Sequence, residues 1–139
     1  IGSERVVAGI GGYNTAEVVE AAHAAHAAGA GALLAVVPYY NRPNQEGLYR
    51  HFQAVAAATP LPVMLYNVPG RTVASLEAST VARLAADCPT IVAIKEASAN
   101  LALVGEILRR TPDTFDVYSG DDGTILPLLA LGGAGVVSV

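Results

Sequence analysis

The chain has 139 residues, of which 53% are hydrophobic, 14% charged and 6% aromatic, and its formal net charge is −4. This length fits one ordinary domain, and the high apolar content excludes a disordered chain. The negative charge, without any lysine or arginine cluster, disfavours a nucleic-acid partner, and no apolar stretch is long enough to span a membrane. Because Cys88 is the only cysteine, an internal disulfide is excluded and a cytoplasmic protein is expected.

Strand-like and helix-like segments alternate along the chain. In chain order we predict a strand at 6–10, a helix at 15–28, a strand at 32–37, a helix at 44–58, a strand at 63–66, a helix at 75–86, a strand at 91–95, a helix at 100–110, a strand at 116–119, a helix at 122–131 and a strand at 135–139. Thr15, Asn44 and Ser75 are the expected N-caps. This alternation predicts an α/β fold with parallel strands, either an open doubly wound sheet or part of a (β/α)8 barrel.

The strand at 91–95 ends in a lysine. Both architectures place chemistry at the carboxyl ends of strands, and Lys95 follows four apolar residues there. By alternation it shares a face with Ile91 and Ala93, and burial there would lower the pKa of its amine and leave a nucleophile for a ketone carbon. A lysine that extends past the strand end to solvent or to a salt bridge is an equally weighted interpretation.

Two further side chains follow the strand at 63–66. Tyr66 closes it and is suited to proton transfer beside a lysine, although taken alone a packed tyrosine is the better interpretation. Arg71 is suited to bidentate binding of a carboxylate, but a solvated loop arginine is the default for any single arginine. His23 and His26 have no third ligand nearby in the sequence, so we predict no metal site.

Several strings, taken together, are similar to one known family. They lie at residues 7–11, 38–41, 45–48, 65–72, 94–97, 119–122 and 132–139, and include Tyr-Asn-Val-Pro-Gly-Arg-Thr at 66–72 and Ile-Lys-Glu-Ala at 94–97. In order and spacing they resemble the dihydrodipicolinate synthase/N-acetylneuraminate lyase family of class I aldolases. The resemblance covers nearly the whole chain, and it implies a (β/α)8 barrel rather than a doubly wound sheet.

The resemblance also implies how much of that barrel is present. It begins at the third barrel strand and stops at the eighth, so residues 1–139 are expected to form a single domain, a partial barrel of about six parallel strands with five intervening helices. The first two βα units and the C-terminal region of the family are not matched. Six strands leave an eight-stranded barrel open, so we expect this segment to be inactive by itself.

The family resemblance assigns roles to particular residues. It implies a lyase that condenses pyruvate with L-aspartate 4-semialdehyde in lysine and diaminopimelate biosynthesis, with no cofactor beyond a covalent lysine imine. The full-length enzyme is expected to be a homo-oligomer, a dimer of dimers. By this resemblance Lys95 would be the imine-forming lysine and Tyr66 the general acid and base. Tyr40 would belong to a proton relay across a dimer, and Arg71 would bind the carboxylate of the second substrate. Gly120 and Val137 would line the pyruvate pocket.

Some positions depart from the family pattern. Glu17 and Tyr39 match a regulatory lysine site, but Tyr13 stands where lysine-inhibited members often carry asparagine. Val73 replaces a common glycine, so we expect the loop that holds Arg71 to differ, because a β-branched residue disfavours positive φ.

Two alternative functions remain open. Arg71 favours the dihydrodipicolinate synthase branch, whereas an aldolase of the same family that acts on a sugar acid, such as N-acetylneuraminate or a keto-deoxy-gluconate, is the first alternative. A catalytically inactive fragment that acts as a structural module through its exposed sheet edges is the second.

Overall fold

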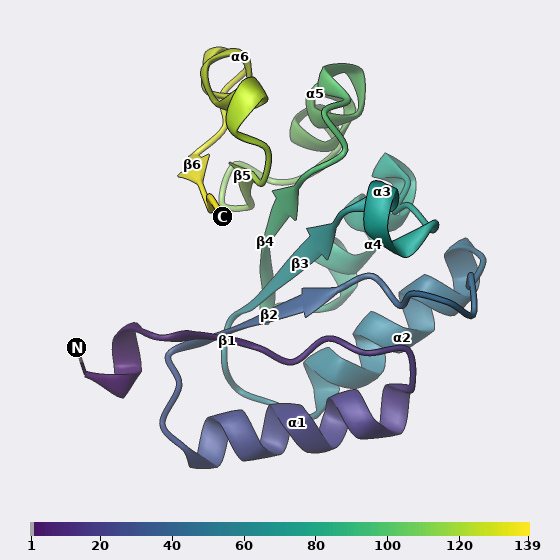
Figure 1. Cartoon of the computed structure of the whole chain (residues 1–139), viewed down its shortest axis with the longest axis vertical. Helices are drawn as coiled ribbons and strands as arrows, with labels where there is room; N and C mark the ends of the chain where they lie inside the picture. The colour runs from purple at the N-terminus through teal and green to yellow at the C-terminus, as the bar shows by residue number, and fades with distance from the viewer. Residues whose placement is uncertain (1) are drawn as a thin grey trace.

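The computed structural model describes residues 2–139. Its strands form one parallel sheet in the order β1-β2-β3-β4-β5-β6. Their bounds are β1 Val7–Gly9, β2 Ala32–Val36, β3 Val63–Asn67, β4 Ile91–Glu96, β5 Asp116–Ser119 and β6 Gly135–Val136. The sheet curls while the helices cover its outer side (Figure 1). Because the strands follow one another in sequence order with no reversal, this is the predicted partial barrel and not a doubly wound sheet.

The helices connect successive strands. They are α1 Thr15–Ala27, α2 Gln45–Ala57, α3 Pro69–Thr72, α4 Ala78–Asp87, α5 Leu101–Arg110 and α6 Ile125–Ala130, with 3₁₀ turns η1 Ser3–Arg5 and η2 Asp122–Thr124. The short helix α3 was not expected, because Pro-Gly in its sequence indicates a loop. The last strand is also shorter than predicted, since only Gly135 and Val136 pair with β5.

The helix starts were predicted with mixed success. Asn44 caps α2 as expected, accepting a hydrogen bond of 2.8 Å from a first-turn amide. Thr15 was the wrong cap for α1, because the side chain of Asn14 accepts the capping bond and Thr15 is already helical. Ser75 was also wrong, since α4 begins three residues later at Ala78. The side chain of Ser75 is free to contact the strand ends instead.

The outer face of the sheet packs against the helices in one apolar core. Its largest fully buried members are Leu33, Leu48, Phe52, Leu65, Leu76, Leu84, Ile94, Ile107 and Leu128. An irregularity in the β3–β4 pairing lets Val63 pair with Ile91 and Met64 with Ala93. Ile91 therefore belongs to the outer core, and the expectation that it shares a face with Lys95 is wrong. The register places Ala93 and Lys95 on the inner face together.

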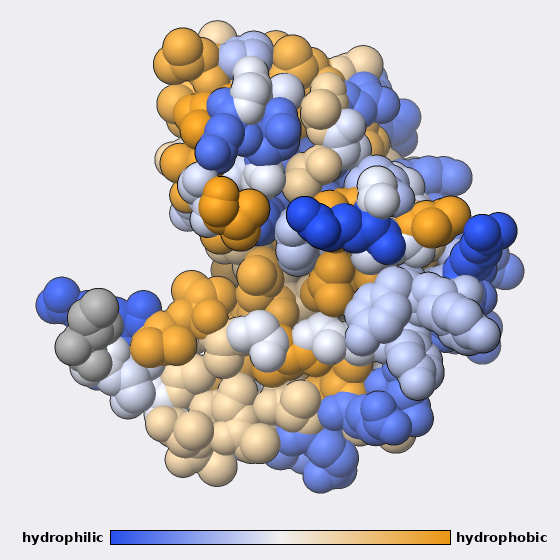
Figure 2. Space-filling view, viewed as in Figure 1, coloured by the Kyte–Doolittle hydropathy of each residue, from blue (hydrophilic) through white to orange (hydrophobic). Residues whose placement is uncertain are grey.

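The inner face of the sheet is only partly covered. Figure 2 shows apolar residues around a hollow between the N-terminal and C-terminal parts, and Val7 of β1 is 50% exposed. The pairing register aligns one row of side chains across this face, which consists of Val36, Tyr66, Lys95, Tyr118 and Gly135. Within residues 2–139, no helix combines the length and apolar character that crossing a membrane requires.

Candidate active site

Lys95 is the only lysine of the chain and lies near the end of β4. The residue is 2% exposed, between Tyr66 of β3 and Tyr118 of β5 in the pairing register. Its Nζ atom lies 4.4 Å from the centre of the Tyr66 ring. No salt bridge of residues 2–139 includes this amine. The structure therefore excludes the interpretation of Lys95 as a solvent-exposed or ion-paired lysine.

Burial lowers the pKa of the Lys95 amine, because removal from water disfavours the ammonium form. The Tyr66 ring face attracts a cation and opposes this effect in part. The neighbouring carboxylate, Glu96, lies on the opposite face of the strand and belongs to a different set of contacts. A lysine in this environment supplies a neutral amine more readily than a solvated one, as a Schiff-base nucleophile requires.

Gly120 makes room for the lysine. A Cβ atom at Gly120 would lie 2.7 Å from Lys95 Cε, 2.9 Å from Lys95 Cγ and 2.8 Å from Ala97 Cβ. The Gly120 amide donates to the Glu96 carbonyl at 2.8 Å, which fixes the backbone against β4. The lysine side chain thus reaches its position only because this residue has no side chain.

Two open pockets meet at the carboxyl edge of the sheet, where the strands end. The first, of about 340 Å³, is lined by Tyr66, Val68, Arg71, Ala97, Gly120, Asp121, Asp122 and Val139. The second, of about 410 Å³, is lined by Gly9, Gly11, Leu34, Val36, Tyr39, Tyr66, Val68, Arg71 and Thr72. Tyr66, Val68 and Arg71 line both. The predicted proton-transfer residue and the predicted carboxylate-binding residue therefore lie at one site.

Helix α3 presents Arg71 to these pockets. Pro69 begins the helix, where its missing N–H has no helical partner to lose. Val73 ends it at φ 60° and ψ 2°, with its amide bonded to the Pro69 carbonyl at 2.9 Å. The expectation that valine avoids positive φ is therefore wrong. Val73 adopts the left-handed conformation at a cost of about 1–2 kcal/mol. No salt bridge of residues 2–139 occupies the Arg71 guanidinium.

Two predicted residues lie apart from this group. Tyr40 is 89% exposed, and its ring lies 6.3 Å from that of Tyr13 rather than in either pocket. Val137 donates its amide to the Ser119 carbonyl at 2.8 Å, which places it beside β5, but Val139 is the residue that lines the first pocket.

The three predicted regulatory residues do lie together. Tyr13, Glu17 and Tyr39 line a hollow of about 150 Å³ at the start of α1. The rings of Tyr13 and Tyr39 meet edge to face with centroids 5.6 Å apart. Tyr39 also lines the second carboxyl-edge pocket, so this hollow adjoins the candidate site.

A buried polar pair behind the lysine was not predicted from the sequence. Asn67 and Glu96 are 0% and 2% exposed, and the Asn67 amide donates to the Glu96 carboxylate at 2.8 Å. Both residues end apolar strands that also carry Tyr66 and Lys95. An acid and an amide at such matching positions were the available signal, but β3 and β4 were each predicted to end one residue too early.

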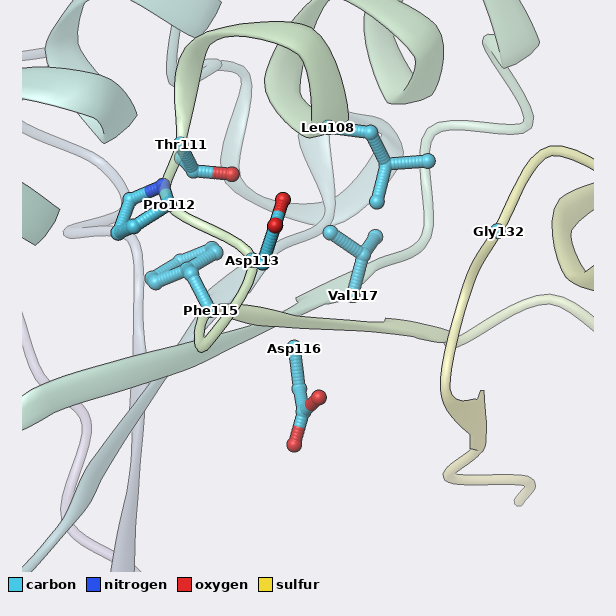
Figure 3. Close-up of a pocket in the computed structure, with 8 residues that line it drawn as sticks. All are labelled: Leu108, Thr111, Pro112, Asp113, Phe115, Asp116, Val117 and Gly132. Atoms are coloured by element: carbon cyan, nitrogen blue, oxygen red, sulfur yellow. The ribbon is translucent and has the colours of Figure 1, made fainter.

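A further hollow lies at the opposite, amino edge of the sheet (Figure 3). It has a volume of about 160 Å³ and is lined by Leu108, Thr111, Pro112, Asp113, Phe115, Asp116, Val117 and Gly132. In Figure 3, Asp116 points away from Leu108 and Thr111. This hollow has no cationic or nucleophilic amine, so the carboxyl edge holds the candidate active site. Across residues 2–139, no three His, Cys, Asp or Glu side chains are grouped closely enough to hold a metal ion.

Comparison with known proteins agrees with this geometry. A sequence model described as the dihydrodipicolinate synthetase family matches residues 2–139. The chain belongs to this family. The 4-hydroxy-tetrahydrodipicolinate synthase of Bacillus subtilis strain 168 is 56% identical over 134 residues, which make up 96% of this chain and 46% of that protein. The family resemblance predicted from the sequence strings is thus confirmed.

Solved structures of dihydrodipicolinate synthases (DHDPS) superimpose closely. DHDPS from Cyanidioschyzon merolae with lysine bound is 53% identical, with a TM-score of 0.95 over 97% of this chain and 46% of that one. Chloride-inhibited DHDPS from Acinetobacter baumannii complexed with pyruvate is 46% identical, with a TM-score of 0.91 over 96% of this chain and 45% of that one. The chain spans about half the length of the relatives it matches.

Proposed function

We propose that a complete barrel containing this chain is a Schiff-base-forming lyase, a 4-hydroxy-tetrahydrodipicolinate synthase of lysine and diaminopimelate biosynthesis. It would condense pyruvate with L-aspartate 4-semialdehyde. The observation that carries the proposal is Lys95, which is buried, not ion-paired within residues 2–139 and next to Tyr66. The identity to the Bacillus subtilis enzyme and the pyruvate complex of the Acinetobacter baumannii enzyme support it.

The proposed reaction begins at the lysine amine. Neutral Nζ attacks the ketone carbon of pyruvate, and loss of water gives an imine. The imine withdraws electrons, so a methyl proton leaves and the resulting enamine carbon attacks the aldehyde of the second substrate. The amino group of that substrate then attacks the imine carbon, releases Lys95 and closes the ring. Tyr66, whose ring lies beside the amine, is the residue proposed to transfer the protons, and the proposed reaction uses no bound cofactor.

Arg71 is the proposed site for the second substrate. Arg71 lines both pockets together with Tyr66, and the planar fork of N–H donors of an arginine matches the carboxylate of aspartate semialdehyde. This contact favours aspartate semialdehyde over a sugar acid, which presents hydroxyl groups at that end. Gly120 would allow the close approach of pyruvate to Lys95, with Val137 and its neighbours closing the pocket.

Two further proposals concern assembly and regulation. The exposure of Tyr40 supports a role across a subunit contact, as in a cytoplasmic dimer of dimers whose partner site receives this tyrosine.

The hollow at Tyr13, Glu17 and Tyr39 is the proposed lysine site, supported by the lysine-bound Cyanidioschyzon merolae relative. Lysine inhibition that is lost in Glu17→Gln, with the uninhibited rate unchanged, would support this assignment.

The substrate choice is tested in a completed barrel, in which this chain replaces the matched 134 residues of the Bacillus subtilis relative. Turnover of pyruvate with aspartate semialdehyde is compared with cleavage of N-acetylneuraminate and keto-deoxy-gluconate. We expect turnover with aspartate semialdehyde alone. Faster cleavage of a sugar acid would favour the first alternative, and failure to bind pyruvate covalently would favour a structural module. The isolated chain, whose inner face is open, is expected to show no turnover.

A further inference from the structure

We propose that the buried Asn67–Glu96 pair is a positioning element that holds Lys95, Tyr66 and the segment after Arg71 in one arrangement. The inference rests on the proposed function, because the proposed function assigns Lys95 and Tyr66 to catalysis and Arg71 to substrate binding. Neither Asn67 nor Glu96 lines a carboxyl-edge pocket, so the pair acts through its neighbours and not on the substrate.

The pair joins the ends of two strands. Asn67 and Glu96 are partners in the β3–β4 register, one residue after Tyr66 and Lys95. Asn67 Nδ2 donates to Glu96 Oε2 at 2.8 Å, while the Ser98 amide donates to Glu96 Oε1 at 2.7 Å. Because successive strand residues point to opposite faces, fixing this pair on the outer face fixes Tyr66 and Lys95 on the inner face.

The same asparagine holds the chain segment that follows Arg71. Asn67 Oδ1 accepts a hydrogen bond of 3.0 Å from the Leu76 amide, and Asn67 Nδ2 lies 3.3 Å from Ser75 Oγ. The carbonyl of Glu96 also accepts the amide of Gly120, the residue that makes room for the lysine. One buried pair therefore contacts β3, β4, the segment after α3 and the residue after β5.

The hydrogen-bond donors and acceptors around Asn67 and Glu96 permit few other arrangements of these two side chains. Burial raises the pKa of the Glu96 carboxyl, whereas the hydrogen bonds from Ser98 and Asn67 lower it. Both carboxylate oxygens already accept bonds from fixed donors, and the Asn67 amide has one orientation that satisfies both Leu76 and Glu96. A shifted register would leave buried polar groups without partners, which is costly.

A polarity swap tests the pair directly. In Glu96→Gln the side-chain amino group faces one of the two fixed donors, and in Asn67→Asp two carboxylates meet. The double variant Asn67→Asp/Glu96→Gln satisfies the network again. The introduced glutamine would donate to the introduced aspartate and accept from the Ser98 amide, while the aspartate would accept from the Leu76 amide.

The swap is measured in the completed barrel by steady-state kinetics and by borohydride trapping of pyruvate across pH. We expect each single variant to lower kcat about 100-fold, since a shift of about 1 Å in a reacting group has an effect of that size. We also expect the trapping curve to move to higher pH as Lys95 becomes better solvated. The double variant should return kcat to within about tenfold of the parent and restore the pH curve.

Thr59→Val is the matched control. Thr59 is 6% exposed before the amino end of β3, and its hydroxyl accepts the Leu61 amide at 3.1 Å. The substitution removes a partly buried hydrogen bond in the segment before β3, away from the carboxyl edge, so it should lower stability while leaving kcat and the pH curve unchanged. Should both single variants fail to fold, Ser75→Ala decides the question. It is expected to raise KM for aspartate semialdehyde severalfold, and an unchanged KM would overturn the inference.

Two other results separate this inference from the proposed function. Folded single variants with parental kcat and an unmoved pH curve would overturn the positioning role, as would a double variant no better than the single ones. If the parent itself does not trap pyruvate at Lys95, the proposed function fails, and the positioning role fails with it.

Discussion

Both edges of the sheet contain residues in the left-handed backbone conformation, with positive φ, but the residue types differ between the two edges. Within residues 2–139, the amino edge carries positive φ only at glycines, at Gly29 after α1 (83°) and Gly132 after α6 (108°). At the carboxyl edge, the loops after β2, β3 and β4 carry it at residues with side chains, which are Tyr40 (72°), Arg42 (46°), Val73 (60°) and Ala99 (57°). Glycine adopts this conformation freely, whereas other residues adopt it at a cost of about 1–2 kcal/mol.

The difference indicates where the sequence retains strain. The amino edge only connects elements, and its left-handed positions are relaxed. The carboxyl edge surrounds Lys95 and Arg71, and three of its loops retain side chains where glycine would be more stable. Strain of this kind persists where the surrounding structure holds it in place, and it gathers at functional sites. Substitutions at and between the two edges test this contrast.

The largest expected effect is at Gly120, the carboxyl-edge glycine against Lys95. Gly120→Ala places a methyl group within 3 Å of the lysine side chain and Ala97, so Lys95 must move. We expect pyruvate trapping in the completed barrel to fall at least about 100-fold. Gly105→Ala is the control, because a Cβ atom there meets nothing within 4 Å and alanine favours the helix. Equal trapping in the two variants would contradict the geometry of the site.

The next effect concerns His51, which is 5% exposed and hydrogen-bonded through Nδ1 to Thr15 at the carboxyl-edge end of α1. Burial lowers its pKa to about 4, and Nε2 has no partner within residues 2–139. Between pH of about 6.5 and 4 the unfolded chain therefore binds a proton that the folded chain does not. The free energy of unfolding should fall as pH falls through this window, by up to about 3 kcal/mol.

Urea unfolding of the chain across this pH range checks the prediction. His51→Gln should flatten the curve, because the titrating group is removed, whereas the exposed His26→Gln should leave it unchanged. Parallel curves for all three proteins would show that His51 does not titrate differently in the folded state.

A smaller effect is expected at Arg71. Arg71→Ala should lower kcat/KM for aspartate semialdehyde about tenfold to 100-fold, since hydrogen bonds to charged groups contribute about 1.5–3 kcal/mol. Pyruvate trapping should remain close to the parental level. Arg110→Ala, which removes an exposed partner of Glu106, is the control and should change neither quantity. A loss of trapping equal to the loss of turnover would place Arg71 in pyruvate binding instead.

The smallest expected effects are changes in the free energy of unfolding at one left-handed position on each edge of the sheet. Val73→Gly should raise the free energy of unfolding by about 1 kcal/mol, because it relieves the strain of φ 60°. Gly29→Ala, at φ 83° on the amino edge, should lower it by about 1 kcal/mol or more. Thermal or urea unfolding of the two variants measures whether each substitution raises or lowers the free energy of unfolding. If Val73→Gly destabilises the chain, the carboxyl edge is not strained in the way described.

The sequence predicted the fold class and the position of the site because both depend on repeating signals. Alternating apolar strands and capped helices require a parallel sheet, and polar residues after each strand identify the carboxyl edge. This pattern singled out Lys95, Tyr66 and Arg71 as candidates, the family resemblance gave them their expected roles, and the structure brings all three to one edge.

The remaining features depend on contacts between distant segments. Neither the β3–β4 irregularity, which moves Ile91 to the outer face, nor the use of Ser75 by Asn67 has a local sequence signal. Val73 in a left-handed turn contradicts local propensity, because the contacts of the surrounding turn override it. Tyr40 was given its expected role by the family resemblance alone, and in the structure it is 89% exposed.

Borohydride reduction of the completed barrel with pyruvate, followed by peptide mass mapping, tests the central claim most directly. Lys95 is the only lysine in this chain, so a reduced adduct on its lysine-containing peptide identifies the residue. We predict labelling there at neutral pH, none in Lys95→Met, and labelling that increases as pH rises through the lowered pKa of Lys95. A folded protein that binds pyruvate without labelling Lys95, or that labels a lysine outside this chain, would contradict the account.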